Sequence, residues 1–215
     1  MAIKKYSLKA NGNTKLSSNF KVKEFACKDG SDTILIADEL VTALQKIRTH
    51  FGKAVTITSA YRNATYNKKI GGATSSQHVK GTAADIQIGG VDPLVVALYA
   101  QSLNLGGVGL YSYVGGGFTH IDVRSGKSRW VQTSSSGTYS TVQQIMPTIR
   151  SGSNNKSTIV LQRKLNQLGY ACGTADGKCG AKTVNAIKAF QTANKLTADG
   201  ICGAKTWNKI AESIK

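Results

Sequence analysis

The segment Ser75-Ser-Gln-His-Val-Lys-Gly-Thr-Ala-Ala-Asp85 decides how we interpret the fold of this chain. It places His78 and Asp85 seven residues apart, with Gly81 between them. An imidazole nitrogen and a carboxylate oxygen are both good ligands for a divalent metal ion. Glycine accepts backbone angles that other residues avoid, so the chain can turn sharply here and bring the two side chains together.

The end of this segment begins a predicted β-strand at residues 83–88, Ala-Ala-Asp-Ile-Gln-Ile. Ile86 and Ile88 fall on one face, which is the pattern of a strand that buries that face. Because successive side chains of a strand point to opposite faces, Asp85 points away from the hydrophobic core. His78 then lies on the loop that enters the strand.

A second strand is predicted at Phe118-Thr-His-Ile-Asp-Val-Arg124. Its alternation places His120, Asp122 and Arg124 on one face and aliphatic side chains on the other. If the two strands are neighbours, two histidines and one aspartate form a three-ligand site with a position left open for water. Open zinc sites of this kind are catalytic far more often than structural. A buried, hydrogen-bonded cluster without metal is the alternative.

These residues carry a family resemblance. The chain resembles the zinc D-Ala-D-Ala carboxypeptidase and L-alanyl-D-glutamate endopeptidase group of peptidoglycan peptidases in the motif Ser76-x-His78-x-x-Gly81-x-Ala83-x-Asp85, followed by a His-x-Asp strand. Two further segments fit that group, Asn19–Phe25 and Ser59–Arg62. The resemblance covers about the first 130 residues in the expected order.

The resemblance implies one Zn²⁺ ion held by His78, Asp85 and His120. It also implies that Arg62 stabilises a substrate carboxylate or the oxyanion, tasks that suit a planar guanidinium. Ser76 either binds substrate near the metal or caps its turn.

These residues do not identify the general base. Many members of the group place an acidic residue three positions before the last metal histidine, where this chain has Gly117. We expect Asp122 to take the proton of the attacking water. Two alternatives stand: Asp122 orients the ring of His120, or Asp122 binds the metal and His120 is the acid or base. Arg124 is expected to be structural.

The other patterns predict an α+β domain with a small, mainly antiparallel sheet, flanking helices and the metal site on the open sheet face. We expect a catalytic domain at 1–131, a linker at 132–144 and a second domain at 145–215. Within the first domain the patterns predict an extended lead-in at 1–33, helices at 36–51 and about 92–104, and strands at 55–59, 83–88, 108–113 and 118–123.

The second domain contains an internal repeat. Asp176-Gly-Lys-Cys-Gly-Ala-Lys-Thr183 recurs with a period of 23 residues as Asp199-Gly-Ile-Cys-Gly-Ala-Lys-Thr206. Each copy precedes a helical pattern, and another helix comes before them, which predicts three short helices joined by equivalent turns. The segment at about 145–215 resembles the three-helix peptidoglycan-binding domain, so both domains point to the same polymer.

Three cysteines, Cys172, Cys179 and Cys202, fall in this domain, and Cys27 stands alone. Their spacing lacks a fourth ligand for a structural zinc site, so we expect buried thiols. A Cys172–Cys179 disulfide is an open alternative.

The charge of the chain limits its partners. Of its 215 residues, 28 are Lys or Arg and 11 are Asp or Glu, which gives a formal net charge of +17. This charge attracts polyanions, and we expect peptidoglycan and anionic wall polymers rather than nucleic acid, because no basic run with interleaved aromatic residues occurs. We expect a monomer.

The N-terminal segment is basic but has no apolar core of a secretory signal, and no run reaches transmembrane length. We therefore expect synthesis in the bacterial cytoplasm, no membrane insertion, and access to the wall through phage lysis. The favoured function is an endolysin-like zinc peptidase that cleaves a stem-peptide bond. The alternatives are a non-catalytic, zinc-containing wall-binding protein, motivated by Gly117, and a basic nucleic-acid-binding protein.

Overall fold

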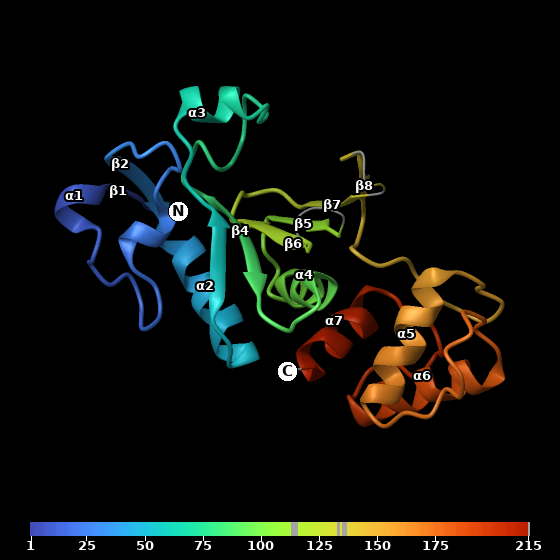
Figure 1. Cartoon of the computed structure of the whole chain (residues 1–215). Helices are drawn as coiled ribbons and strands as arrows, with labels where there is room; N and C mark the ends of the chain where they lie inside the picture. The colour runs from blue at the N-terminus through green and yellow to red at the C-terminus, as the bar shows by residue number, and fades with distance from the viewer. Residues whose placement is uncertain (113–115, 133, 135–136, 215) are drawn as a thin grey trace. The chain divides into compact units, whose positions relative to one another are not determined.

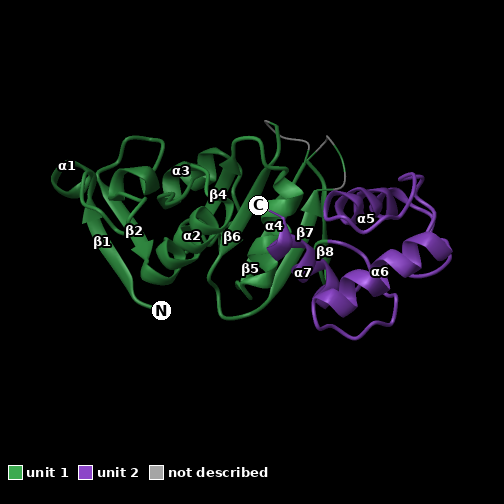
Figure 2. Ribbon diagram, turned by 90° about the horizontal axis from the view of Figure 1, so that it is seen from below, with its two compact units in different colours: residues 1–145 green, residues 146–215 purple. Residues whose placement is uncertain are grey.

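The computed structural model describes residues 1–112, 116–132, 134 and 137–214. The chain forms two compact units, residues 1–145 and 146–215 (Figure 2). The first unit combines sheets with helices, and the described residues of the second form three helices. These elements are labelled in Figure 1. The predicted α+β fold with a helical second part is confirmed.

The first unit is built on a six-stranded sheet with the order β3-β4-β6-β5-β7-β8. Neighbouring strands are antiparallel except for β5 and β7, which are parallel. The strands are β3 (Val55–Ser59), β4 (Ala83–Ile88), β5 (Gly107–Tyr111), β6 (Phe118–Asp122), β7 (Ser128–Gln132) and β8 (Tyr139–Val142). The four strands expected from the sequence are present. The tip of the expected hairpin, at 113–115, lies outside the described residues.

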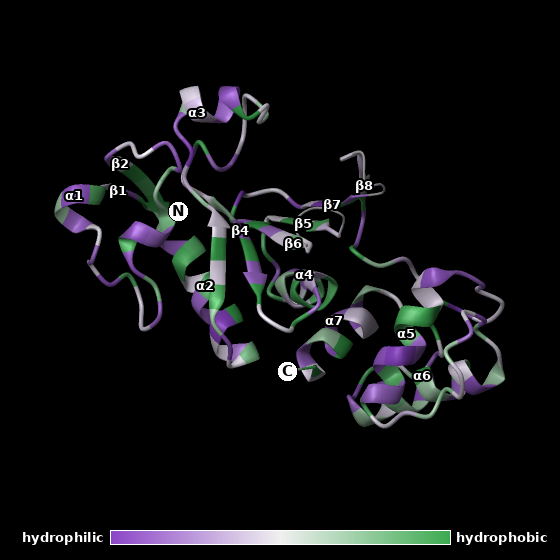
Figure 3. Ribbon diagram, in the orientation of Figure 1, coloured by the Kyte–Doolittle hydropathy of each residue, from purple (hydrophilic) through white to green (hydrophobic). Residues whose placement is uncertain are grey.

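One face of this sheet is aliphatic and is covered by helices. Helix α4 (Pro93–Ser102) packs against β4, β5 and β6, and helix α2 (Asp38–Phe51) packs against α4 and β3. The strands alternate in hydropathy while α4 is largely hydrophobic (Figure 3). The buried aliphatic side chains of this face include Ala84, Ile86, Ile88, Val108, Leu110 and Ile121. The opposite face is therefore free to carry polar side chains.

The start of α4 and the end of α2 lie close to the predicted bounds, and each has a residue suited to a helix terminus. Asp92 caps α4 by accepting a hydrogen bond from the backbone N–H of Leu94 at 2.9 Å, and Pro93 occupies the first turn. Gly52 ends α2 in the left-handed conformation. No described helix has both the length and the apolar character that spanning a membrane requires.

The expectation of a simple extended lead-in at 1–33 is wrong. Strand β1 (Ile3–Ser7) pairs antiparallel with β2 (Thr33–Ala37), and a short helix α1 (Leu8–Asn11) and a 3-10 helix η1 (Val22–Phe25) lie between them in the chain. Helix α2 consequently begins at Asp38, since the two residues before it belong to β2. This pairing joins segments far apart in sequence, which no local pattern reveals.

The segment 132–144, expected to be a linker, contains a strand. Strand β8 pairs with β7, with Thr141 opposite Trp130 and Tyr139 opposite Gln132. Small uncharged residues suit an edge strand with one solvated side as well as they suit a linker, so composition alone could not separate the two. Residues 133, 135 and 136 of the expected linker lie outside the described residues.

The second unit contains α5 (Lys156–Gln167), α6 (Ala181–Ala193) and α7 (Ala204–Ser213), as the repeat predicted. The four cysteines of the chain are free and buried, which agrees with the expected thiols; Cys172 and Cys179 form no disulfide.

A buried glutamine explains why the two copies of the repeat share their sequence. The side-chain nitrogen of Gln162 lies 3.0 Å from Asp176 Oδ1, 3.1 Å from the carbonyl of Lys178 and 3.0 Å from Thr183 Oγ1. Its side-chain oxygen accepts the N–H of Gly177 at 2.9 Å. Gln191 makes the equivalent contacts in the second copy, with Asp199, Gly200, Ile201 and Thr206. Each glutamine thus fixes one Asp-Gly turn to its helix.

Replacing Gln162 by Ala should lower the free energy of unfolding of the second unit by about 2 to 3 kcal/mol, because it leaves buried polar groups without their partner. Hydrogen exchange of peptides from residues 146–214 in urea measures this loss. Gln167 is exposed on the same helix, so Gln167→Ala is the matched control and should change stability by less than about 0.5 kcal/mol. Equal losses in both variants would contradict this role of Gln162.

Candidate metal centre

The polar face of the sheet carries a row of residues that are partners across neighbouring strands. Asp85 on β4 lies opposite His120 on β6, and His120 lies opposite Gly109 on β5. Gly109 lies opposite Trp130 on β7, which lies opposite Thr141 on β8. Residues paired in this way project to the same face, so the sheet brings Asp85 and His120 together.

His78 joins this pair from the loop before β4. The loop is held by hydrogen bonds from the N–H groups of Arg62 and Gly81 to the carbonyl of His78, at 3.2 and 3.1 Å. Gly81 has a φ of +71°, as the expected sharp turn requires. His78 is 4% exposed, so its ring is fixed inside the protein and not presented to solvent.

Three ligand atoms converge at one point. His78 Nε2 lies 3.2 Å from His120 Nδ1 and 3.3 Å from Asp85 Oδ1, and the latter two atoms are 2.8 Å apart. Metal–ligand bonds of about 2.0–2.1 Å at tetrahedral angles place ligand atoms about 3.3 Å apart. The triangle of donors therefore fits one small, four-coordinate ion, and His78, Asp85 and His120 could hold it.

The second nitrogen of each ring determines which atom faces the cluster. His78 Nδ1 lies 2.7 Å from the carbonyl of Ala60, and His120 Nε2 lies 3.1 Å from Asp122 Oδ2. Both partners are acceptors, so each of these nitrogens carries the proton of the neutral ring. The lone pairs of the other two nitrogens then point at the same place, which is how metal-binding histidines are oriented.

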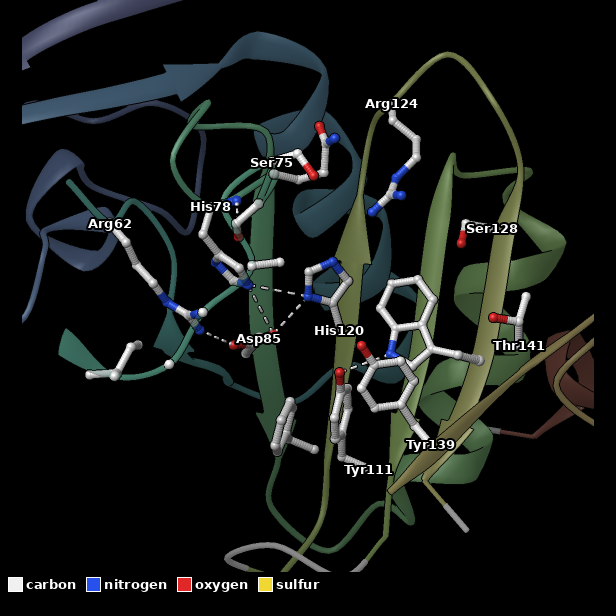
Figure 4. Close-up of a pocket in the computed structure, with 18 residues that line it drawn as sticks. Arg62, Ser75, His78, Asp85, Tyr111, His120, Arg124, Ser128, Tyr139 and Thr141 are labelled. Atoms are coloured by element: carbon white, nitrogen blue, oxygen red, sulfur yellow. Dashed lines mark hydrogen bonds and ion pairs between the residues drawn. The ribbon is translucent and has the colours of Figure 1, made fainter. Parts of the chain in front are cut away.

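Asp85 is held from its other side by Arg62. Its Oδ2 forms an ion pair with Arg62 Nη2 at 2.7 Å, while Arg62 Nε donates to Ser59 Oγ at 2.8 Å. Figure 4 shows Arg62 reaching Asp85 from the side opposite to His120. Asp85 Oδ2 is thereby paired with the arginine, and Asp85 Oδ1 is directed to the cluster.

The electrostatics of the cluster favour a positive charge at its centre. Although burial works to raise the pKa of Asp85, the imidazoles of His120 and His78 beside it hold that pKa well below its usual range. Although burial works to lower the pKa of His120, the carboxylates of Asp122 and Asp85 raise it above its usual value. A buried carboxylate facing two ring nitrogens thus favours positive charge at this point, which either a proton on an imidazole or a metal ion supplies.

Asp122, expected to be the base, is 0% exposed and lies on the far side of the His120 ring from the cluster. Besides His120 it accepts hydrogen bonds from Arg124 Nε, at 2.8 Å to Oδ1 and 2.9 Å to Oδ2, and from the Arg124 backbone N–H at 3.1 Å. Both oxygens are occupied, and Asp122 does not line the pocket described below. This geometry is that of the alternative in which Asp122 orients the imidazole.

The cluster opens into a pocket of about 550 Å³ (Figure 4). Two arginines, Arg62 and Arg124, give it positive charge, and Asp85 is the single carboxylate among its described lining residues. Ser76 also lines it and accepts the N–H of His78 at 3.3 Å, so it both caps its turn and faces the pocket. An aromatic wall completes it, made of Tyr111, Phe118, Trp130 and Tyr139.

The sequence did not predict the aromatic wall, and Trp130 is the member of it that lies against His120. Its ring centre lies 5.0 Å from that of His120, and its Nε1 donates to the hydroxyl of Tyr111 at 2.9 Å. The indole covers Gly109, where a Cβ would lie only 2.3 Å from it. Glycine inside a strand often marks a place where another group packs closely on the backbone. The glycines of Gly107-Val-Gly109 were therefore the one feature of the sequence that could have indicated a large side chain here.

An acidic side chain would not fit at Gly117, the position where many members of the family have one. Gly117 has a φ of +81°, and a Cβ there would lie 2.9 Å from Pro93 Cγ and 3.0 Å from the carbonyl oxygen of Tyr111. A side chain at this position would be strained by its backbone and by its neighbours. The departure from the acidic pattern is thus part of the local fold.

The comparisons with known proteins agree with these observations. Residues 17–122 match the family described as peptidase M15, and residues 154–210 match a putative peptidoglycan-binding domain. The first match contains His78, Asp85 and His120 and ends before β7 and β8. No curated protein matches the chain.

Three solved structures resemble parts of the chain. A peptidoglycan-binding protein from Clostridioides difficile, in complex with glutamine hydroxamate, is 38% identical over 34% of this chain and 46% of its own, with a TM-score of 0.30. A Burkholderia AP3 phage endolysin is 38% identical over 30% of this chain and 24% of its own, with a TM-score of 0.29. The SleB N-terminal domain is 33% identical over 32% of this chain and 94% of its own, with a TM-score of 0.31. The chain thus spans less than half of the length of the first two.

Replacing Gly109 by Ala should displace the indole of Trp130 and lower the free energy of unfolding by about 1 to 3 kcal/mol, because the new methyl group overlaps the ring. Near-ultraviolet circular dichroism reports the ring displacement, and urea unfolding reports the stability. A Cβ added at Gly126 would meet no atom within 4 Å, and the backbone there has no positive φ, so Gly126→Ala is the matched control. An unchanged aromatic signal in Gly109→Ala would contradict the packing described here.

Proposed function

Because residues 17–122 form a peptidase M15 domain and residues 154–210 form a peptidoglycan-binding domain, we propose that this protein is a zinc-dependent, endolysin-like peptidase that hydrolyses a peptide bond of the peptidoglycan stem peptide. The two domains support a cell-wall peptidase. Zinc, the role of each residue and the access route through phage lysis are the finer parts of the proposal.

The single observation that carries the proposal is the orientation of the two imidazoles. Their outer nitrogens are held by the carbonyl of Ala60 and by Asp122, so both inner nitrogens are directed at the oxygen of Asp85. Nothing in a hydrogen-bonded core cluster requires two lone pairs and a carboxylate to meet. Two nitrogens and one oxygen suit zinc, with one position left for water.

When bound, zinc would lower the pKa of a water molecule towards neutrality and polarise the scissile carbonyl. The protein supplies the rest. Arg62 holds Asp85 through Nη2 and also lines the pocket, where it can bind a substrate carboxylate or the oxyanion. Asp122 keeps His120 in the required tautomer, and we assign it this positioning role in place of general base.

The pocket suits an anionic peptide. Stem peptides carry several carboxylates, and Arg62 and Arg124 provide two positive charges beside the cluster. The same chemistry serves D-Ala-D-Ala trimming, L-Ala-D-Glu cleavage and cross-bridge cleavage. The second unit and the net charge of +17 hold the enzyme on an anionic wall.

A second candidate is a wall-binding protein that keeps the metal without catalysis. It is favoured by Gly117, because the acidic residue expected at that position is absent. The two candidates differ in whether purified peptidoglycan is cut.

Purified sacculi incubated with the protein should release peptide-containing fragments, and a chelator should abolish the release until zinc is returned. Mass spectrometry of the new termini identifies the bond. His78→Ala should lower the rate at least about 10³-fold, since it removes a ligand. His50→Ala, which changes a histidine that stacks on Tyr99 and is not part of the cluster, is the matched control. Binding to sacculi without any fragment would favour the second candidate.

Asp122→Asn separates positioning from proton transfer. An Asn oxygen still accepts from His120, so at saturating zinc kcat should fall by less than about tenfold, whereas zinc affinity falls about tenfold or more. A general base would instead show a loss of about 10² to 10⁴ in kcat that zinc cannot restore. Asp38→Asn, at an exposed surface ion pair with Lys4, serves as the control.

A further inference from the structure

We propose that Tyr111 is a catalytic residue of this site, donating the hydrogen bond that stabilises the oxyanion during peptide hydrolysis, and that Trp130 positions it. This inference rests on the proposed function and extends it to residues that no family match assigns. It concerns a hydrogen bond and requires no covalent step by the tyrosine.

Tyr111 is placed on the correct face of the sheet. It follows Gly109 by two residues on β5, and Gly109 is the cross-strand partner of His120. Because strand side chains alternate, Tyr111 projects to the same face as His120. It lines the pocket together with the three cluster residues, and Figure 4 shows its hydroxyl end directed to the side of His120 and Asp85.

The hydroxyl proton of Tyr111 has a defined direction. Trp130 Nε1 lies 2.9 Å from the Tyr111 hydroxyl. An indole N–H can only donate, so the phenolic oxygen accepts this bond and must direct its own proton elsewhere. Since Tyr111 lines the pocket, its proton can be directed into it. The ring is also fixed, since it stacks on Phe118 with centres 4.4 Å apart and planes 9° apart.

Tyr111 remains a donor at neutral pH. Burial raises the pKa of its phenol, and the charge of Asp85 adds to this, while the hydrogen bond from Trp130 works in the opposite direction. The net effect keeps the hydroxyl protonated. A fixed donor of this kind, partly removed from water, is what stabilises developing negative charge in a transition state.

The other donors of the pocket are less suited to this task. Arg62 is engaged with Asp85 and Ser59, and Arg124 with Asp122. Tyr139 lines the pocket but is 59% exposed, so its hydroxyl is not preorganised in the same way. With Tyr111 at the oxyanion, Arg62 is left for a substrate carboxylate.

Tyr111→Phe tests the proposal, because it removes one oxygen atom and keeps the ring. With zinc content unchanged, kcat on the fragment-release assay should fall about 10²- to 10³-fold while KM changes little. Tyr6→Phe is the matched control, since Tyr6 lies on β1 away from the pocket. Wild-type kcat in Tyr111→Phe, with active wild-type protein, would overturn the role of Tyr111 and leave the proposed function standing.

A binding measurement gives a readout besides turnover. A phosphinate analogue of the cleaved bond mimics the tetrahedral oxyanion, so calorimetry should show its affinity lowered about 10- to 100-fold in Tyr111→Phe. Affinity for the product peptide should stay the same. Equal affinity of both proteins for the phosphinate would also overturn the proposal.

Trp130→Phe tests whether Trp130 positions Tyr111. It also tests the role of Tyr111 if the Tyr111→Phe variant loses its zinc. It keeps Tyr111 but removes the indole N–H, so kcat should fall about tenfold with zinc retained. In the double variant the loss should not exceed that of Tyr111→Phe alone, because both changes act through one hydroxyl. Unchanged kcat in Trp130→Phe, or additive losses, would contradict the Trp130–Tyr111 link.

Wild-type protein that releases no fragment overturns the proposed function, and the role of Tyr111 falls with it.

Discussion

The antiparallel pairing of β4 with β6, with Asp85 opposite His120, is the constraint on which the rest of the site depends. A slip of one residue would turn both side chains to the other face. The register is fixed from the opposite side of the sheet, where Ile86 and Ile121 are buried under α4 at 1% and 0% exposure. Hydrophobic packing on one face thus sets the polar geometry on the other.

The sequence revealed the cluster because its signals are local. His78 and Asp85 lie within one short segment, and the alternation around His120 indicates its face. The aromatic wall gave no such signal, since the parallel pairing of β5 with β7 joins segments that only the folded chain brings together. Trp130 follows the part of the chain that matches the peptidase family, and β8 has the composition of a linker. The features that the sequence did not predict depend on long-range pairing.

The role of Asp122 illustrates where residue type and spacing stop being sufficient. Its place two residues after His120 is compatible with base, ligand or orienting partner, and only the contacts separate them. Its oxygens accept from Arg124 and from the outer nitrogen of His120. Protonation would break these charge-assisted bonds inside a fully buried site, which is costly. The energetics therefore favour a carboxylate that stays charged and holds the ring.

A peptidase site that lacks a dedicated acidic base loses catalytic rate but can still catalyse hydrolysis. A positioned general base contributes roughly 10²- to 10⁴-fold, and a fixed oxyanion donor contributes roughly 10²- to 10³-fold. Tyr111, oriented by Trp130, is the donor that we propose for the second task. Zinc held by His78, Asp85 and His120 would lower the pKa of a bound water towards neutrality, so less help from a base would be needed. Gly117 therefore argues for slower hydrolysis, and it does not by itself make this protein a binding module.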